Sequence, residues 1–216
     1  MFYAHGLHGE AGRGSAAEFS IRVLESDGRL DTWRPLADPS LEEGNVLFSE
    51  EDCRDPEIVK GAGSKEYYLY YASGAGHLDP ANRNEIRVRR SRDLLHWSDP
   101  ITVLLTPPGY GAAESPFVLY RDNLYYLWVS GWDYARMSLY VSEDPLNFGD
   151  PSNSRIMEQA GHACQIVQHG GSDWIGCVRI GNSSDVTDLK GVYLQPLMWR
   201  EADALMRGKI NRIAPT

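Results

Sequence analysis

IRVRRSRDLLHW (residues 86–97) and MSLYVSEDPLNF (137–148) share one pattern: an alternating strand, then Ser, a charged residue, Asp, two further residues and a polar-aromatic end. A third segment, KGVYLQPLMW (190–199), keeps the strand and the final Trp. A fourth, FSIRVLESDGRLDTW (19–33), keeps Ser, Asp and Trp with one residue inserted. The four segments indicate an internal repeat, which has to be recognised before any fold is assigned.

The aromatic residues that end these segments are regularly spaced. Trp97, Phe148 and Trp199 follow one another at intervals of 51 residues, and Trp33 precedes Trp97 by 64. These aromatic residues occupy repeat positions, so we interpret Trp97, Phe148 and Trp199 as packing residues.

Each copy contains further strand patterns. An aromatic strand ending in Gly precedes each one: KEYYLYYASG (65–74), NLYYLWVSG (123–131), SDWIGCVRIG (172–181) and MFYAHGLHG (1–9). A short apolar strand comes before three of these: DPEIVKG (55–61), ESPFVLY (114–120) and HACQIVQ (162–168). An outer strand follows each aromatic end: NVLFSE (45–50), ITVLLT (101–106), SRIMEQ (154–159) and KINRIAP (209–215).

Four short antiparallel strands, repeated about every 50 to 60 residues, are typical of β-propeller blades. We therefore predict an all-β chain with a single propeller domain over residues 1–216, divided approximately into blades 1–50, 51–106, 107–159 and 160–216. A β-sandwich is the structural alternative, but it does not predict matching turn chemistry at a regular period. EADALMRG (201–208) predicts one short helix that ends at Gly208.

Composition excludes several classes of function. A formal net charge of −9 argues against nucleic-acid binding, which depends on clustered Lys and Arg. The one dense basic run, Arg87, Arg89, Arg90 and Arg92, alternates along a predicted strand and is interpreted as a solvated face. The sequence shows no secretory signal and no membrane-spanning run, so we expect a cytoplasmic protein without a membrane partner.

The cysteines form neither a disulfide framework nor a C-x-x-C metal site. Cys164 and Cys177 would face each other across a hairpin at Gly170-Gly171. Two buried thiols are favoured over a cross-strand disulfide, because disulfide geometry is exacting.

Chemically useful side chains occur where the short apolar strands begin. In a propeller, the first strand of each blade lines the central channel, and three such strands begin with Asp55, Glu114 and His162. Their separations of 59 and 48 residues match the repeat, so these side chains should gather at one end of the axis. Two carboxyl groups in such a cluster suit the cleavage of glycosidic bonds, in which one protonates the leaving oxygen.

RDPEIV (54–59), AESPFVLY (113–120), SRDLLHW (91–97) and GHA (161–163) together resemble motifs of the five-bladed propeller glycoside hydrolases of families 43 and 32. The resemblance covers nearly all of the chain and rests on the order and spacing of these motifs. It implies hydrolysis of an oligo- or polysaccharide such as an arabinoside, xyloside or fructoside. It requires no cofactor, although it allows a structural calcium ion in the central channel.

The resemblance also assigns roles to residues. Glu114 corresponds to the general acid, and Asp55 to the Asp that orients substrate and tunes the acid or stabilises the transition state. His162 corresponds to a His that touches substrate, a bound ion or its waters, which makes it a weak candidate for metal binding. Each has a plainer interpretation: Asp55 starts a strand before Pro56, Glu114 is a loop carboxylate and His162 is a structural imidazole.

Further residues are candidates for contacts with the sugar. Trp132 and Tyr110 would stack on a ring face, and His77 would hydrogen-bond a hydroxyl group. Arg54 and Arg179 complete the predicted substrate-binding set.

The chain departs from the family pattern in its first blade. The family's third carboxylate, a base or nucleophile, is an Asp on the inner strand of the first blade, whereas this sequence opens at what we interpret as a second strand. Three explanations are open: a shortened or fragmentary member without activity, completion by a second subunit, or replacement by another residue. His5, His8 and Glu10 are the nearest replacements, while Asp38 is interpreted as part of a connecting loop.

The functional alternatives follow from this departure. The chain is a glycosidase, a carbohydrate-binding propeller that has lost catalysis, or a purely structural repeat module. Because an incomplete propeller exposes its terminal blades, we also predict self-association into a homo-oligomer.

Overall fold

The computed structural model describes eleven segments of the chain: residues 1–6, 18–29, 31–39, 41, 46–51, 53–74, 84–106, 113–131, 136–150, 154–179 and 191–199. They form β-strands β1 Phe2–Gly6, β2 Glu18–Glu25, β3 Arg34–Pro35, β4 Val46–Glu51, β5 Arg54–Lys60, β6 Tyr67–Ser73, β7 Glu85–Ser91, β8 Ile101–Leu105, β9 Ala113–Arg121, β10 Leu124–Gly131, β11 Arg136–Ser142, β12 Arg155–Ala160, β13 His162–His169, β14 Ser172–Arg179 and β15 Gly191–Leu197. Within these segments, no helix is long and apolar enough to cross a membrane.

The strands form four antiparallel sheets, each built from consecutive strands. Sheet one has the order β1-β2-β4 with the short β3 also paired to β2, sheet two is β5-β6-β7-β8, sheet three is β9-β10-β11-β12 and sheet four is β13-β14-β15. The predicted outer strands at 45–50, 101–106 and 154–159 correspond to β4, β8 and β12. The fourth, at 209–215, and the predicted helix at 201–208 lie outside the described residues.

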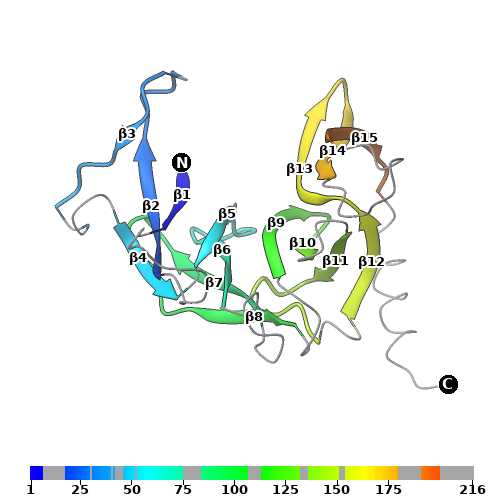
Figure 1. The fold of residues 1–216 in the computed structure, drawn as a ribbon, viewed down its shortest axis with the longest axis horizontal. Helices are drawn as coiled ribbons and strands as arrows, with labels where there is room; N and C mark the ends of the chain where they lie inside the picture. The colour runs from blue at the N-terminus through cyan, green and yellow to red at the C-terminus, as the bar shows by residue number, and fades with distance from the viewer. Residues whose placement is uncertain are drawn as a thin grey trace.

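The sheets are arranged as blades along an open arc (Figure 1). The first strands β5, β9 and β13 lie toward the centre, and β4, β8 and β12 lie on the outside. β9 contacts both β5 and β13, and β1 contacts β5. Sheets one and four stand at the two ends of the arc, and their described strands make no substantial contact. The predicted propeller fold is therefore confirmed, without closure of the ring in the described part of the chain.

β1 occupies the position of a second strand. In sheet one the order β1-β2-β4 matches β6-β7-β8 of sheet two, and among the described strands β1 pairs only with β2. β1 is thus a second strand, as the sequence pattern predicted, and the described residues contain no inner strand for sheet one.

The repeated Ser and Asp residues build the same turn in sheets two and three. The amide of Asp93 donates to Ser91 Oγ and that of Leu95 to Asp93 Oδ1, at 3.2 and 2.9 Å. In the next copy, the amide of Asp144 donates to Ser142 Oγ at 3.1 Å, and Asp144 Oδ1 accepts a bond of 2.9 Å. Short polar side chains that bond nearby amides stabilise such turns, which explains why the repeat could be read from the sequence.

Three hydrophobic clusters fill the spaces between successive sheets. Phe148 is fully buried between sheets two and three, while Trp97 and Trp199 pack against the other two clusters. Their interpretation as packing residues is confirmed. Cys164 and Cys177 are buried free thiols, so the disulfide alternative is wrong.

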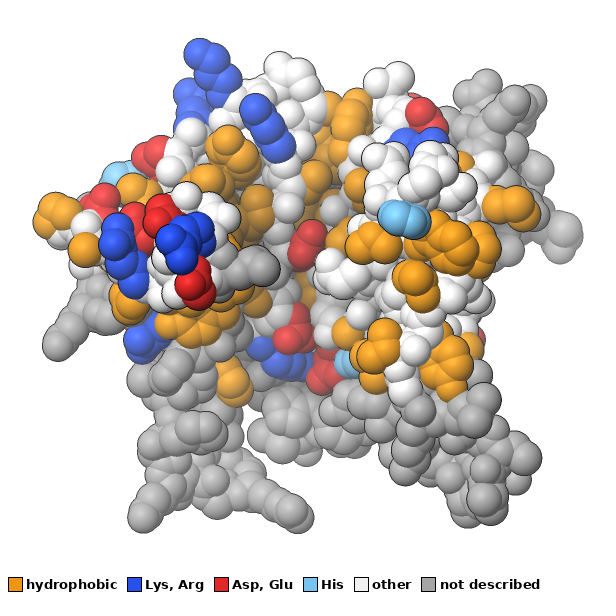
Figure 2. All heavy atoms as spheres, turned by 90° about the horizontal axis from the view of Figure 1, so that it is seen from above, with side chains coloured by type: hydrophobic (Ala, Val, Ile, Leu, Met, Phe, Trp, Pro, Cys, Tyr) orange, Lys and Arg blue, Asp and Glu red, His pale blue; other side chains and the backbone are white. Residues whose placement is uncertain are grey.

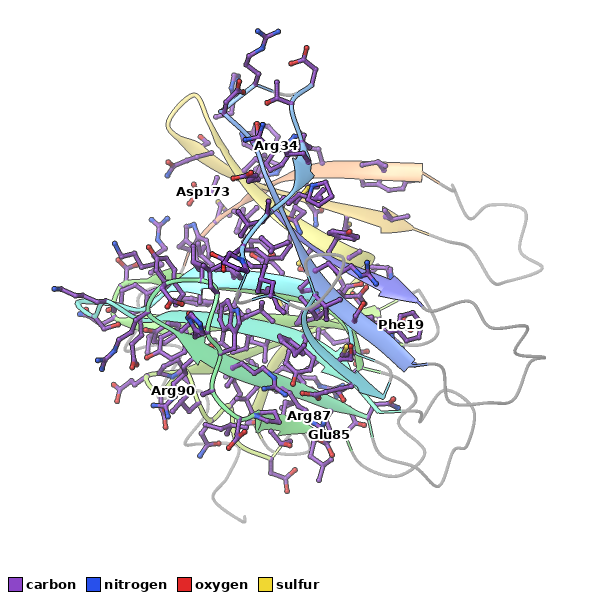
Figure 3. All side chains as sticks on the ribbon, turned by 90° about the vertical axis from the view of Figure 1, so that its left-hand side faces the viewer. Phe19, Arg34, Glu85, Arg87, Arg90 and Asp173 are labelled. Carbon is purple, nitrogen blue, oxygen red and sulfur yellow. The ribbon has the colours of Figure 1, made fainter. Side chains whose placement is uncertain are left out.

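The interpretation of the basic run as a solvated face is wrong for two of its residues. Arg92 is 79% exposed, but Arg87 and Arg89 of β7 form ion pairs with Glu50 of β4. Figure 3 shows Arg87 beside Glu85 toward one end of the strands and Arg90 toward the other. Side chains that alternate along a strand can meet a neighbouring sheet, and here they meet a carboxylate from sheet one.

Sheet four has an apolar outer face. Val167, Val192 and Leu194 lie on the side of this sheet opposite its buried cluster and are 49, 81 and 60% exposed. In the view of Figure 2, apolar side chains gather on the side of β13 to β15, whereas charged side chains dominate the opposite side. Self-association remains a prediction, and this face is the kind of surface it requires.

Candidate active site

The three inner strands begin with the same irregularity. In β5, Arg54 pairs with Ala72 and the next paired residue is Glu57, which opposes Tyr70. The same shift occurs between Glu114 and Phe117 in β9 and between His162 and Gln165 in β13. Each shift is a β-bulge, which inserts one extra residue and turns the side chains beside it.

The bulges correct the sequence alignment by one residue. Asp55, Ser115 and Ala163 have φ values of 56, 46 and 50°, so these three are equivalent. The equivalent residues before them are Arg54, Glu114 and His162. The sequence pattern aligns Asp55 with Glu114 instead, because the position of an extra residue cannot be read from strand periodicity.

The three residues that precede the bulges form one charged cluster. Arg54 Nη2 donates to Glu114 Oε1 at 3.1 Å, and His162 Nε2 lies 3.9 Å from Glu114 Oε2. The side chains are only 15, 12 and 10% exposed in the order Arg54, Glu114 and His162. Three successive blades thus place a carboxylate between a guanidinium and an imidazole, which fixes the orientation of the carboxylate.

Asp55 contacts the bulge of the neighbouring strand. Its Oδ2 accepts a hydrogen bond of 2.9 Å from the amide of Ser115 and a longer one, 3.4 Å, from Ser115 Oγ. Ser115 directly follows Glu114, so Asp55 holds the backbone that carries Glu114. Asp55 and Glu114 are linked in this way through the chain.

The bulge in β13 is held by a different group. The amide of Ala163 donates to Ser130 Oγ of β10 at 2.8 Å, and Ser130 is the strand partner of Glu114. Ser130 was missed in the sequence because its role depends on contact between blades. The backbones beside Glu114 and His162 are therefore both fixed by a polar side chain of the preceding sheet.

Gly161 packs tightly beside His162. Its φ is +137°, and a Cβ atom there would lie 2.7 Å from Cys177 Sγ and 3.0 Å from Met137 Cε. Only glycine avoids both the unfavourable backbone conformation and the clash. Gly161 therefore fixes how the chain enters β13 and presents His162.

We expect Gly161→Ala to destabilise the protein more than the control Gly170→Ala. Gly170 also has positive φ, +60°, but its Cβ would meet nothing within 4 Å. The difference in unfolding free energy should be about 1–3 kcal/mol, the usual cost of overpacking a core. Urea denaturation of both variants measures it, and equal losses would contradict the crowding argument.

Glu57 is a second partly buried carboxyl group on β5. Burial raises its pKa from 4.5 to about 7. Sequence reasoning missed this residue, because only the bulge places it on the same face of the sheet as Arg54. Simple strand alternation would instead place Glu57 on the same face as Asp55, two residues earlier in the sequence.

The raised pKa of Glu57 predicts a pH-dependent stability. The folded protein binds this proton more tightly than the unfolded chain, so its stabilising effect is complete below pH 4.5 and is lost as the pH rises through about 7. Glu57→Gln, which resembles the protonated form, should therefore be more stable than the wild type at pH 8, by at most about 3 kcal/mol, and similar at pH 4.5. Denaturant titrations at both pH values test this, with Glu66→Gln as a control. A constant difference would contradict it.

Other predicted site residues fall outside the described side chains. His77, Tyr110 and Trp132, together with His8 and Glu10, lie outside the described residues. Arg179 and His5 lie in β14 and β1, but only their backbones are described. Their proposed contacts with substrate stay predictions. Asp38 lies between β3 and β4, outside any strand, as expected for a connecting loop.

The described residues include no group of three or more His, Cys, Asp or Glu side chains placed to hold a metal ion. The charged cluster itself contains one carboxylate, one imidazole and one cation. Its arginine repels a metal ion, so the cluster favours an uncharged polar ligand over a cation.

Comparison with known proteins identifies the fold. No protein-family model matches the chain, and no curated protein matches it in sequence. Among solved structures, the chain is similar to a thermostable family-43 glycoside hydrolase, with 17% identity and a TM-score of 0.66 over 93% of this chain and 68% of that one.

Two further structures show the same relationship. An α-L-arabinofuranosidase from Lactobacillus brevis matches with 14% identity and a TM-score of 0.62, over 93% of this chain and 69% of that one. A family-32 β-fructofuranosidase from Bombyx mori matches with 16% identity and a TM-score of 0.58, over 90% of this chain but only 44% of that one. The similarity confirms the expected fold, and the chain spans about two fifths to two thirds of the length of these proteins.

Proposed function

We propose that the protein hydrolyses a glycosidic bond in an oligo- or polysaccharide, with Glu114 as the general acid. The observation that carries the proposal is the Glu114 carboxyl group, held by Arg54 and adjacent to His162 where three inner strands begin. The structural neighbours, a family-43 glycoside hydrolase, an arabinofuranosidase and a fructofuranosidase, support a substrate such as an arabinoside or a fructoside.

In the proposed reaction, Glu114 donates its proton to the leaving oxygen as the glycosidic bond breaks. Asp55 holds the Ser115 amide and thereby fixes the backbone next to Glu114. Its negative charge lies beside the bulge that carries Glu114, where it would favour the positive charge that develops on the sugar ring. Arg54 and His162 orient the acid and bind sugar hydroxyl groups. Such chemistry requires no cofactor.

The alternative function is carbohydrate binding without catalysis. One observation favours it: among the described strands, sheet one lacks the inner strand that would carry the family's third carboxylate. Without a base or nucleophile, a polar cluster of this kind would still bind a sugar through hydrogen bonds.

Two measurements on the wild-type chain separate these functions. The first is turnover of a panel of aryl arabinosides, xylosides and fructosides, and the second is calorimetry with the corresponding oligosaccharides. Turnover supports the hydrolase, and binding without turnover supports the alternative. If the chain shows no binding and no turnover, both functions are contradicted and a structural module is left.

A further inference from the structure

Glu57 lies inside the arc, on the same sheet face as Arg54. Arg54 and Glu57 oppose Ala72 and Tyr70, two residues apart on β6, so the bulge places both side chains on one side of sheet two. Arg54 uses that side to reach Glu114 of β9. Glu57 therefore also faces sheet three, one step further along β5.

The equivalent residues show that the position does not require a carboxylate. Phe117 follows the bulge of β9, is 7% exposed and packs against Trp128. Gln165 follows the bulge of β13 and is exposed. A glutamate at a position where burial disfavours its charge costs stability, so packing alone does not explain it.

The groups around Glu57 leave its carboxyl available. Among the described residues it forms no hydrogen bond or ion pair. The charge on Glu57 contributes to the raised pKa of Cys164 on β13, after burial and Cys177. The titratable groups on the same face of sheet two are Arg54 on its own strand and Tyr70 on β6, whereas Asp55 is directed at Ser115. Arg54 in turn binds Glu114 of β9, which lies beside His162 of β13.

We propose that Glu57 is the general base of the hydrolysis proposed above. The proposal rests on the proposed function. The Glu57 carboxylate removes a proton from a water molecule, whose oxygen bonds to the anomeric carbon. The glycosidic bond breaks with its electron pair on the leaving oxygen, which takes the proton of Glu114. The sugar leaves with inverted configuration, and solvent restores both carboxyl groups.

The spacing along β5 suits this division of roles. Arg54 reaches Glu114 with its guanidinium group, and Glu57 is one same-face step from Arg54, about 7 Å along the strand. Inverting glycosidases place their two carboxyl groups about 6.5–9.5 Å apart, with room for a water molecule between them. A base is also most effective when its pKa lies near the working pH, as burial arranges for Glu57.

Glu57→Ala and Glu57→Gln test the proposal on whichever aryl glycoside the wild type hydrolyses. Both variants should lose about 10²–10⁴-fold in kcat. Azide should restore turnover of Glu57→Ala and yield the glycosyl azide of inverted configuration, because the small anion attacks where the activated water did. The wild-type profile of kcat should rise with pH through a limb near 7 that Glu57→Gln lacks. Glu66→Gln is the matched control and should behave as the wild type, because Glu66 pairs with the exposed Arg92.

The outcomes separate this proposal from the proposed function. If the wild type is active and the kcat of Glu57→Gln lies within threefold of the wild-type value, only the role of Glu57 is overturned. The same holds if the variants lose activity but azide does not rescue Glu57→Ala and the pH limb remains in Glu57→Gln. A wild type that hydrolyses no glycoside overturns the proposed function, and the base with it. Circular dichroism of both variants shows whether a loss of activity accompanies a loss of fold.

Discussion

Glu114→Gln is expected to lower kcat/KM on unactivated oligosaccharides by about 10²–10⁴-fold, the usual contribution of a positioned general acid. Glutamine has the shape of glutamate and keeps an oxygen that can accept from Arg54 Nη2, which lies 3.1 Å from the present carboxylate. The fold and the position of Arg54 should therefore survive the change. What the variant lacks is the proton for the leaving oxygen.

The loss should depend on the leaving group. Dinitrophenolate leaves without protonation, so Glu114→Gln should hydrolyse a dinitrophenyl glycoside at a rate close to that of the wild type. An oligosaccharide should be almost inert to this variant. Steady-state kinetics on a series of aryl glycosides of decreasing leaving-group acidity measures this dependence. Removal of the base at Glu57 should affect all members of the series.

Glu66→Gln again serves as the matched control, because Glu66 lies away from the cluster and pairs with the exposed Arg92. An equal loss on all leaving groups would show that Glu114 positions substrate instead of protonating it. Unchanged turnover of oligosaccharides by Glu114→Gln would contradict the assignment of the acid.

Local patterns predicted the architecture because local chemistry builds it. The Ser-x-Asp turns repeat in sheets two and three with matching hydrogen bonds, so the same residues mark the same place in each blade. The aromatic second strands are buried in the way their composition suggested, since β6 and β10 are covered on both faces. Repetition then gave the order of the strands.

The site was predictable only in part, because its details depend on contacts between blades. Glu114 and His162 were identified at the start of their strands, and the structure brings them together with Arg54. The bulge that separates Arg54 from Asp55 in register leaves no periodic signal. Glu57 was missed for the same reason, since its face follows from that extra residue.

Glu50→Ala is expected to be the most destabilising single change at the junction between sheets one and two. Glu50 Oε2 accepts from Arg87 Nη1 at 2.9 Å, its Oε1 accepts from Arg89, and Tyr71 Oη donates to it at 2.9 Å. Glu50 belongs to β4, whereas all three donors belong to sheet two. Arg89 and Glu50 are only 14 and 13% exposed, so water cannot replace the carboxylate fully.

Removing one partner of a buried ion pair leaves the other charge desolvated, which costs about 3–5 kcal/mol. Here two guanidinium groups lose their shared acceptor, and in a chain of this size the loss corresponds to a fall in melting temperature of about 6–20 °C. Glu50→Gln keeps one acceptor oxygen and should lose less. Asp31→Ala, which breaks the pair of Arg29 and Asp31 whose side chains are 70% exposed, should cost less than about 1 kcal/mol.

Calorimetry of the three variants, followed by a double-mutant cycle between Glu50 and Arg89, measures how much of the cost is coupling. If the cost arises from the desolvated guanidinium, Glu50→Ala combined with Arg89→Leu should recover part of the stability that Glu50→Ala alone loses. Strictly additive losses would mean that the two side chains contribute independently, Arg89 by packing on Phe48, over whose ring its guanidinium lies at 4.3 Å. In that case the carboxylate would not be what joins sheet one to the rest of the arc.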